Sequence, residues 1–157
     1  MAGNRVYSTY FENVTIAAVQ DIFSIKAGAA NGVILHQIDL SAGGVTSPAE
    51  IRLRLKRLPA TVTNGSGGAA PTISATDSGD TKASAATVRA NDTTQATTSG
   101  TAAILAAWQW NVLNQFTYLP APEDREIIQA AEALVLDIAG APASTVVSGT
   151  IKWAETP

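Results

Sequence analysis

The acidic side chains that could perform acid–base chemistry or bind a cation lie in two regions of the sequence. One is the acidic run 123–126, and the other contains Asp77, Asp80 and Asp92 within a Ser- and Thr-rich stretch. Glycoside hydrolysis needs two carboxyl groups facing each other across a cleft, which neighbouring acids do not provide. An EF-hand calcium loop needs acids at alternate positions, and that alternation is missing. We therefore predict solvated turns and loop acids in both regions.

Nucleophile and metal chemistry are restricted by the chain's composition, which includes no cysteine and a single histidine, His36. Thiol nucleophiles, Cys-ligated zinc, iron–sulfur clusters and multi-histidine metal sites within one chain are excluded. A serine nucleophile would need His36 as its base, and no G-x-S-x-G turn is present to expose one. Alternation places His36 on one strand face with Ile34 and Ile38, which favours a core or interface histidine. We predict no enzymatic activity, no metal, no cofactor and no small-molecule substrate.

A glycine-rich segment, residues 65–70, matches the loose G-x-G-x-x-A form of a dinucleotide-binding loop. That mechanism needs a helix directly after the glycines, because the helix N-terminus binds the pyrophosphate. Residues 71–74 instead read Pro-Thr-Ile-Ser, which does not begin a helix. We interpret the segment as a flexible Gly-rich bend.

Composition also argues against nucleic-acid and membrane partners. The 157 residues include 10 Lys and Arg against 13 Asp and Glu, a net charge of -3, whereas phosphate binding needs a basic excess. The uncharged stretch 93–122 is interrupted by Thr, Ser, Gln, Asn and Pro and does not predict a membrane span. The sequence after Met1 shows no apolar segment of a signal peptide.

A basic stripe is the most distinctive charge pattern in the sequence. Arg52, Arg54, Lys56 and Arg57 supply four of the 10 positive charges, and the first three alternate with apolar residues over 51–56. Period two puts the apolar residues on one face of a strand and the cations on the other. This is either a docking face for an acidic protein surface or a solvated, charge-protected strand.

Three aromatic residues, Tyr7, Tyr10 and Phe11, follow Arg5 near the start of the chain. We expect residues 1–12 to form an N-terminal arm or edge strand ahead of one domain, residues 13–157. As an arm, these residues would bind a partner, because aromatic and Arg side chains are good interface anchors.

A second aromatic group contains Trp108, Trp110, Phe116 and Tyr118. The two tryptophans are two positions apart and should share one face of a strand. In a monomer they would fill the core, and in an oligomer one could line a shared axis.

The elements that position these residues read as strands. About eight segments show period-two alternation or enrichment in β-branched and aromatic residues. They are residues 5–11, 14–26, 33–40, 51–56, 85–91, 104–112, 132–138 and 145–153. Asn31-Gly32 marks a turn, and residues 122–128 predict at most a single helical turn.

Between the strands, residues 61–100 are dominated by Ala, Gly, Ser and Thr. They are either a flexible linker or, as we expect, a long surface loop of the same domain with a short strand inside it. We therefore predict an all-β fold: an antiparallel jelly-roll sandwich of about eight strands with one long Ser/Thr/Gly/Ala-rich loop.

Seven local patterns, in this order, resemble a family of small proteins encoded among the structural genes of tailed bacteriophages and prophages. They are VQDIFSIKA at 19–27, VILHQI at 33–38, IRLRLKRL at 51–58, NGSGGAAP at 64–71, ATVRANDTT at 86–94, LPAPE at 119–123 and VSGTIKWAE at 147–155. The resemblance spans residues 18–155. Where the family has a Pro-Gly-Glu turn, this chain has Ala130-Ala131-Glu132.

The resemblance implies a tumour-necrosis-factor-like jelly roll, a homotrimer, and a non-enzymatic role as a capsid decoration (cement) protein. The implied partner is the phage major capsid protein, and the implied location is the outer surface of the virion after synthesis in the host cytoplasm. Residues 5–11 and the basic stripe would then contact the capsid. The alternative is a tail- or fibre-associated module that binds a host glycan or receptor, with Trp108 or Tyr118 exposed for sugar stacking.

Overall fold

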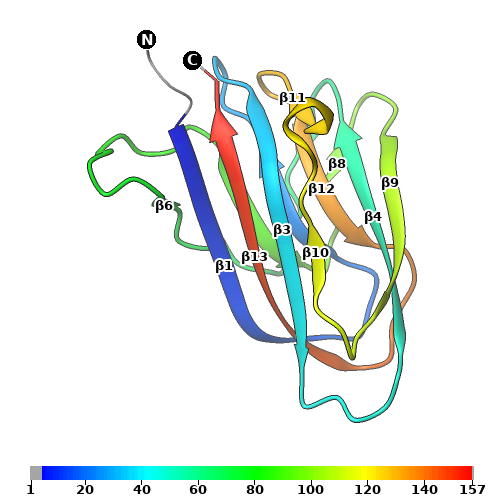
Figure 1. Cartoon of the computed structure of the whole chain (residues 1–157). Helices are drawn as coiled ribbons and strands as arrows, with labels where there is room; N and C mark the ends of the chain where they lie inside the picture. The colour runs from blue at the N-terminus through cyan, green and yellow to red at the C-terminus, as the bar shows by residue number, and fades with distance from the viewer. Residues whose placement is uncertain (1–4, 157) are drawn as a thin grey trace.

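The computed structural model describes residues 5–156, which form two packed antiparallel sheets and one short antiparallel pair of strands (Figure 1). The first sheet contains, in spatial order, β10 (Phe116–Tyr118), β3 (Val33–Gly43), β13 (Thr145–Glu155), β1 (Arg5–Ile16) and β6 (Ser74–Ala75), and β11 (Ile127–Ile128) also pairs with β3. The second contains β7 (Thr87–Asp92), β2 (Asp21–Lys26), β12 (Ala133–Ile138), β4 (Glu50–Leu58) and β9 (Ala103–Asn111). The small pair is β5 (Val62–Thr63) with β8 (Thr97–Thr98).

The strand order is that of a jelly roll. Strands of the first half of the chain pair with strands of the second half in reverse order: β1 with β13, β2 with β12, β3 with β10, and β4 with β9. One long antiparallel hairpin is thus rolled into two sheets. The predicted all-β class is confirmed, and β7 is an addition at the edge of the second sheet.

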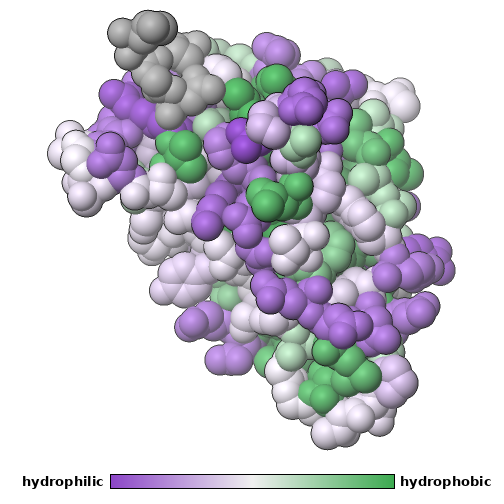
Figure 2. All heavy atoms as spheres, in the orientation of Figure 1, coloured by the Kyte–Doolittle hydropathy of each residue, from purple (hydrophilic) through white to green (hydrophobic). Residues whose placement is uncertain are grey.

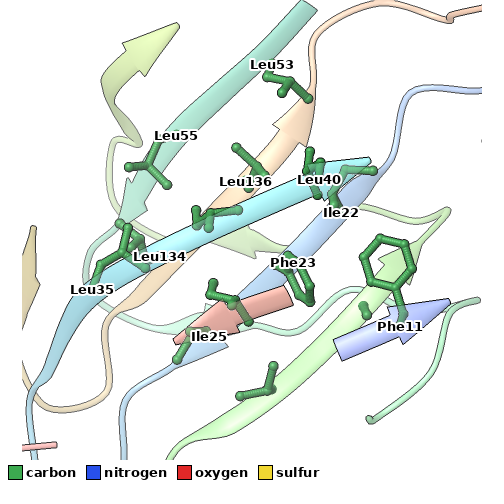
Figure 3. Packing of buried hydrophobic residues seen from close by; sticks show 14 of the residues in the cluster. Phe11, Ile22, Phe23, Ile25, Leu35, Leu40, Leu53, Leu55, Leu134 and Leu136 are labelled. Atoms are coloured by element: carbon green, nitrogen blue, oxygen red, sulfur yellow. The ribbon is translucent and has the colours of Figure 1, made fainter. Parts of the chain in front are cut away.

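The core lies between the sheets and follows from period-two alternation. In β4, Ile51, Leu53 and Leu55 are buried while the cations between them point away, as predicted. Figure 3 shows side chains of β2, β4 and β12 facing Phe11, Leu35 and Leu40 of the other sheet. Fully burying one such side chain contributes about 1.5–3 kcal/mol, so this alternation determines which sheet face turns inward.

Residues 61–100 form a structured excursion rather than a linker. Its β5–β8 pair covers the outer face of the second sheet, where Val62 and Ala96 pack with Leu58, Ala133 and Val135 in a second small core. For this reason every residue of β12 is buried, on both faces. The expected short strand is β7.

Two strand assignments differ from the sequence prediction, and one predicted turn is confirmed. The predicted strand 14–26 is two elements, because β1 ends at Ile16 and the chain crosses to the other sheet before Asp21. Phe116–Tyr118 is a short strand that alternation over three residues does not reveal. The single helical turn predicted within 122–128 is confirmed as a 3₁₀ turn at Pro122–Asp124.

A β-bulge at His36 corrects the predicted face of that residue. In the pairing with β13, Leu35 lies opposite Trp153 and Gln37 opposite Lys152, so His36 is the extra residue. The bulge changes which face alternate residues occupy: Leu35 is buried before it and Ile38 after it. His36 therefore does not share a face with Ile38.

Candidate functional site

Two of the four cations of the basic stripe, Arg54 and Lys56, bind the buried acid Asp137. Asp137 lies opposite Arg54 in the pairing of β12 with β4 and has no exposed surface. Its Oδ2 is 2.7 Å from Arg54 Nη2 and 2.7 Å from Lys56 Nζ, and its Oδ1 accepts a hydrogen bond from Arg54 Nε at 3.1 Å. Burial alone would raise the pKa of Asp137, but the hydrogen bonds and charges of Arg54 and Lys56 hold this pKa below its ordinary value. These two cations stabilise the fold and are not free for docking.

A second buried acid completes this polar layer under the excursion. Asp21 Oδ2 accepts the backbone N–H of Ala96 at 2.7 Å, and Gln95 Nε2 donates to both Asp21 and Asp137. Burial raises the pKa of Asp21, although the Ala96 N–H and Lys56 favour its charged form. The excursion is thus fixed to the second sheet by charge-assisted hydrogen bonds.

The remaining cations of the stripe, Arg52 and Arg57, are exposed. Arg52 lies opposite Gln109 and Arg57 opposite Ala103, so both stand beside β9 at the edge of the second sheet. The sequence signal that distinguishes the two pairs is Asp137, a single acid in the otherwise apolar strand ALVLDI.

The predicted N-terminal arm is a strand of the sandwich, since β1 lies between β13 and β6. Tyr7 is buried and its hydroxyl donates to Lys82 O at 3.1 Å, while Phe11 packs on Phe23 with ring centroids 5.1 Å apart. Arg5 pairs with Asp80 at 3.1 Å. Of the four predicted partner-binding residues here, Tyr10 alone projects a large free side chain, 60% exposed.

The predicted domain boundary between residues 12 and 13 falls inside β1. A β-bulge is present at that point, where the register with β13 shifts between Phe11 and Val14 and Asn13 adopts a left-handed φ of 53°. Residues 1–4 of the predicted arm, and residue 157, lie outside the described part of the chain.

The second aromatic group closes the opposite edge of the sandwich. Trp108 packs on Phe116 and Tyr118, with centroid distances of 5.3 and 4.9 Å, and Trp110 packs on Phe116 at 6.4 Å. Trp110 Nε1 donates to the carbonyl of Asn114 at 2.7 Å. The two tryptophans share the inward face, as their spacing predicts.

The Tyr118 hydroxyl donates to Glu126, and burial together with Glu126 raises the pKa of Tyr118. The rings of Trp108 and Tyr118 pack against each other at an angle of 56°, and both residues are only partly exposed, so each ring is partly covered by the other.

Outside this aromatic group, β9 presents an unprotected edge. Among the described residues it pairs with β4 alone. Ile104 and Leu105 on this strand are 58% and 38% exposed, and no charged residue occurs between Thr93 and Pro122. Figure 2 shows hydrophobic side chains gathered at the right-hand side, over the upper part of β9. Exposed edge strands usually bear charges or proline, which prevent pairing with another chain.

The acids and glycines considered for chemistry have structural roles. Asp92, expected to be a solvated loop acid, is buried: it pairs with Arg89 at 2.6 Å and accepts the N–H of Gly68 at 3.0 Å. Gly68 lies so close to β7 that an added Cβ would be 2.1 Å from Ala90 O. The Gly-rich bend is therefore packed on β7.

Within residues 5–156, no three His, Asp or Glu side chains converge in a way that could hold a metal ion. No helix in that part of the chain is long and apolar enough to cross a membrane.

Comparisons with known proteins give no assignment. The sequence matches no protein-family model and no curated protein. A chain from a solved structure of infectious bursal disease virus, Gx strain, aligns over 99% of this chain with 15% identity, and this chain covers 40% of its length. The TM-score of 0.12 is too low for this likeness to support an argument about fold or function.

Proposed function

We propose that this protein is a homotrimeric capsid decoration (cement) protein that binds the major capsid protein on the outer surface of a tailed-phage head. The observation that supports the proposal best is the β9 edge, which is uncharged, apolar and unpaired among the described residues. A solvent-exposed edge of this kind promotes aggregation unless a partner covers it. The resemblance of the sequence to trimeric phage jelly rolls suggests which partner that is.

A threefold assembly fits an edge of this kind. A ring of three copies needs a heterologous contact, in which one surface of a copy meets a different surface of the next. The apolar β9 edge, with Ile104 and Leu105 outward and the Trp108 group behind it, supplies one half of that contact. Attachment at several points would then convert weak individual capsid contacts into firm binding.

Arg52 and Arg57 are the capsid contacts that we retain from the basic stripe. Both are exposed and lie beside β9, at the rim of the assembly surface. Charges at a rim guide association with an oppositely charged surface more than they add affinity. An acidic patch on the capsid would therefore attract this rim.

Binding to undecorated heads of the matching phage tests this function. We expect the wild-type protein to co-sediment with the heads saturably, and Arg52→Glu to weaken binding roughly two- to fivefold at low salt, as for an exposed ion pair. Lys82→Glu makes the same charge change on the excursion, away from β9, and should bind like the wild type. Failure of wild-type trimers to bind the heads would rule out the decoration role.

A further inference from the structure

Two surface cavities share the exposed ring of Tyr10. One, of 460 Å³, lies at the edge of the sandwich between β1, the crossing at Gln20, and the excursion from Gly67 to Thr93. The other, of 330 Å³, is lined by residues of β1, β3 and β13 together with Gln115. Both volumes fall within the range of small-ligand sites, roughly 300–1,000 Å³.

The larger cavity has an uncharged lining with neutral hydrogen-bonding groups. Apolar surface from Phe11, Val14 and Pro71 alternates with the amides of Gln20 and Asn91 and with threonine hydroxyls. The part of a ligand that enters this cavity is therefore uncharged and carries both apolar and hydrogen-bonding groups.

Asn91 lines this cavity, and its side chain carries a polar atom that is buried without a partner within residues 5–156. The residue is 8% exposed, and its Oδ1 has no hydrogen-bond partner among the described residues. A buried polar group that stays unpaired is unfavourable. Its left-handed φ of 58° and the paired hydrogen bonds between Ala90 and Ala69 fix the backbone at the cavity wall.

The smaller cavity adds hydroxyl groups and one free acid. Ser41, Ser148 and Thr150 line it, with Glu12 and Asp39. Asp39 already accepts hydrogen bonds from Gln37 at 2.6 Å and Thr117 at 2.8 Å, whereas Glu12 is exposed. Glu12 can accept hydrogen bonds from ligand hydroxyls and would repel an anionic ligand.

From these features we infer that Tyr10 and its two cavities form a binding site for a neutral carbohydrate. The Tyr10 ring stacks on the apolar face of one sugar ring, since an exposed aromatic ring offers a flat, weakly polar surface. The amides of Gln20 and Asn91 on one side, and Glu12 on the other, bind hydroxyl groups. This site differs from the aromatic pair Trp108 and Tyr118 at the opposite edge, and it goes beyond the proposed capsid role.

An array of neutral and sialylated glycans, followed by NMR titration with methyl glycosides of the neutral sugars that bind, tests this inference. We expect neutral glycans to bind, Tyr10→Ala to weaken binding by roughly tenfold, and Tyr10→Phe to retain it. Asn91→Gly keeps the left-handed backbone accessible, removes the amide and should also weaken binding. Leu119→Ala, another exposed apolar position, is the matched control and should bind like the wild type.

Three results would overturn the inference: no neutral glycan binds, sialylated glycans bind better than neutral ones, or Tyr10→Ala binds as well as the wild type. A negative result for carbohydrate binding would leave the proposed capsid role unaffected. Tyr10→Ala should still form trimers and co-sediment with phage heads, because Tyr10 lies away from β9.

Discussion

The two long edges of the sandwich are built in opposite ways. At the edge of β1 and β7, the chain covers itself: Figure 1 shows the loop with β6 beside β1, on the opposite side of the molecule from β9. Thr9 Oγ1 donates to Thr72 O at 2.7 Å, Ala69 and Ala90 exchange backbone hydrogen bonds, and Glu155 accepts the N–H of Ala86 at 3.0 Å. Small residues allow this close approach of backbones.

At the edge of β9 and β10, large aromatic side chains fill the gap between the sheets instead, and the outside of β9 stays apolar and uncharged. Residues 61–100 cover one edge of the sandwich, and the other edge stays open. The open edge is therefore the surface to examine for assembly, and the covered edge stabilises the monomer.

Asp137→Asn should produce the largest loss of stability, because it leaves Arg54 and Lys56 without their buried partner. Removing one member of a buried ion pair costs about 3–5 kcal/mol, which urea unfolding at pH 7 would measure. Asp77→Asn, at an exposed turn, should change stability by less than about 0.5 kcal/mol. A loss below about 1 kcal/mol for Asp137→Asn would show that Asp137 is not the stabilising buried partner of Arg54 and Lys56.

The two buried acids should give opposite pH dependences. The pKa of Asp137 is lowered, so its stabilisation is complete above the ordinary Asp pKa of about 3.9 and is lost as the pH falls toward the lowered value. The pKa of Asp21 is raised, so folding loses stability as the pH rises from about 3.9 through the raised value. Urea unfolding between pH 3 and 7 should show that the unfolding free energy of Asp21→Asn rises relative to that of the wild type as the pH rises. If the unfolding free energies of Asp21→Asn and Asp137→Asn changed with pH in the same direction relative to the wild type, these assignments would be contradicted.

Gly68→Ala tests the close packing of the covered edge. The added Cβ would meet the carbonyl of Ala90 at 2.1 Å, and forcing such contacts typically costs about 1–3 kcal/mol. Gly43→Ala is the matched control, since nothing lies within 4 Å of its Cβ position. If thermal unfolding showed equal midpoints for the two variants, the bend would not be packed on β7 as described.

A smaller gain is expected at the turn before β12. Ala131 adopts a left-handed φ of 67°, which costs an L-residue roughly 1–2 kcal/mol and glycine almost nothing. Ala131→Gly should therefore raise the unfolding free energy by about 1 kcal/mol, while Ala130→Gly should not. A drop in stability for Ala131→Gly would indicate that the backbone there is not strained.

The sequence predicts much of this fold because alternation depends on local residues alone. Ile51–Lys56, the C-terminal strand and the inward tryptophans all follow from it. The bulges at Asn13 and His36 escaped prediction because they depend on pairing with β13, which is distant in sequence.

The candidate sites were less predictable for the same reason. Tyr10 is visible in the sequence as an aromatic, but its exposure depends on strand parity within β1. Asn91 lines the same cavity as Tyr10 only because the excursion folds back on the sandwich, and no local sequence pattern predicts this. Asp137, a lone acid among apolar residues, is the one signal that could have revealed the pairing of Arg54 and Lys56.

At the open edge, Ile104→Lys should have the smallest effect on the folded monomer, less than about 0.5 kcal/mol, because this side chain is exposed. Its effect on assembly should be complete, since three buried lysines would meet the apolar contact without partners. Val19→Lys, which changes an exposed valine in the crossing between β1 and β2, is the matched control and should assemble like the wild type.

Size-exclusion chromatography with light scattering, at low and high salt, tests the central claim most directly. Wild type and Val19→Lys should both run as trimers at both salt concentrations, because the proposed interface is apolar and little screened by salt. Ile104→Lys should run as a monomer with an unchanged β-sheet circular dichroism spectrum. A wild-type protein that stays monomeric at both salts, or an Ile104→Lys variant that stays trimeric, would contradict the assignment of the β9 edge as the assembly surface.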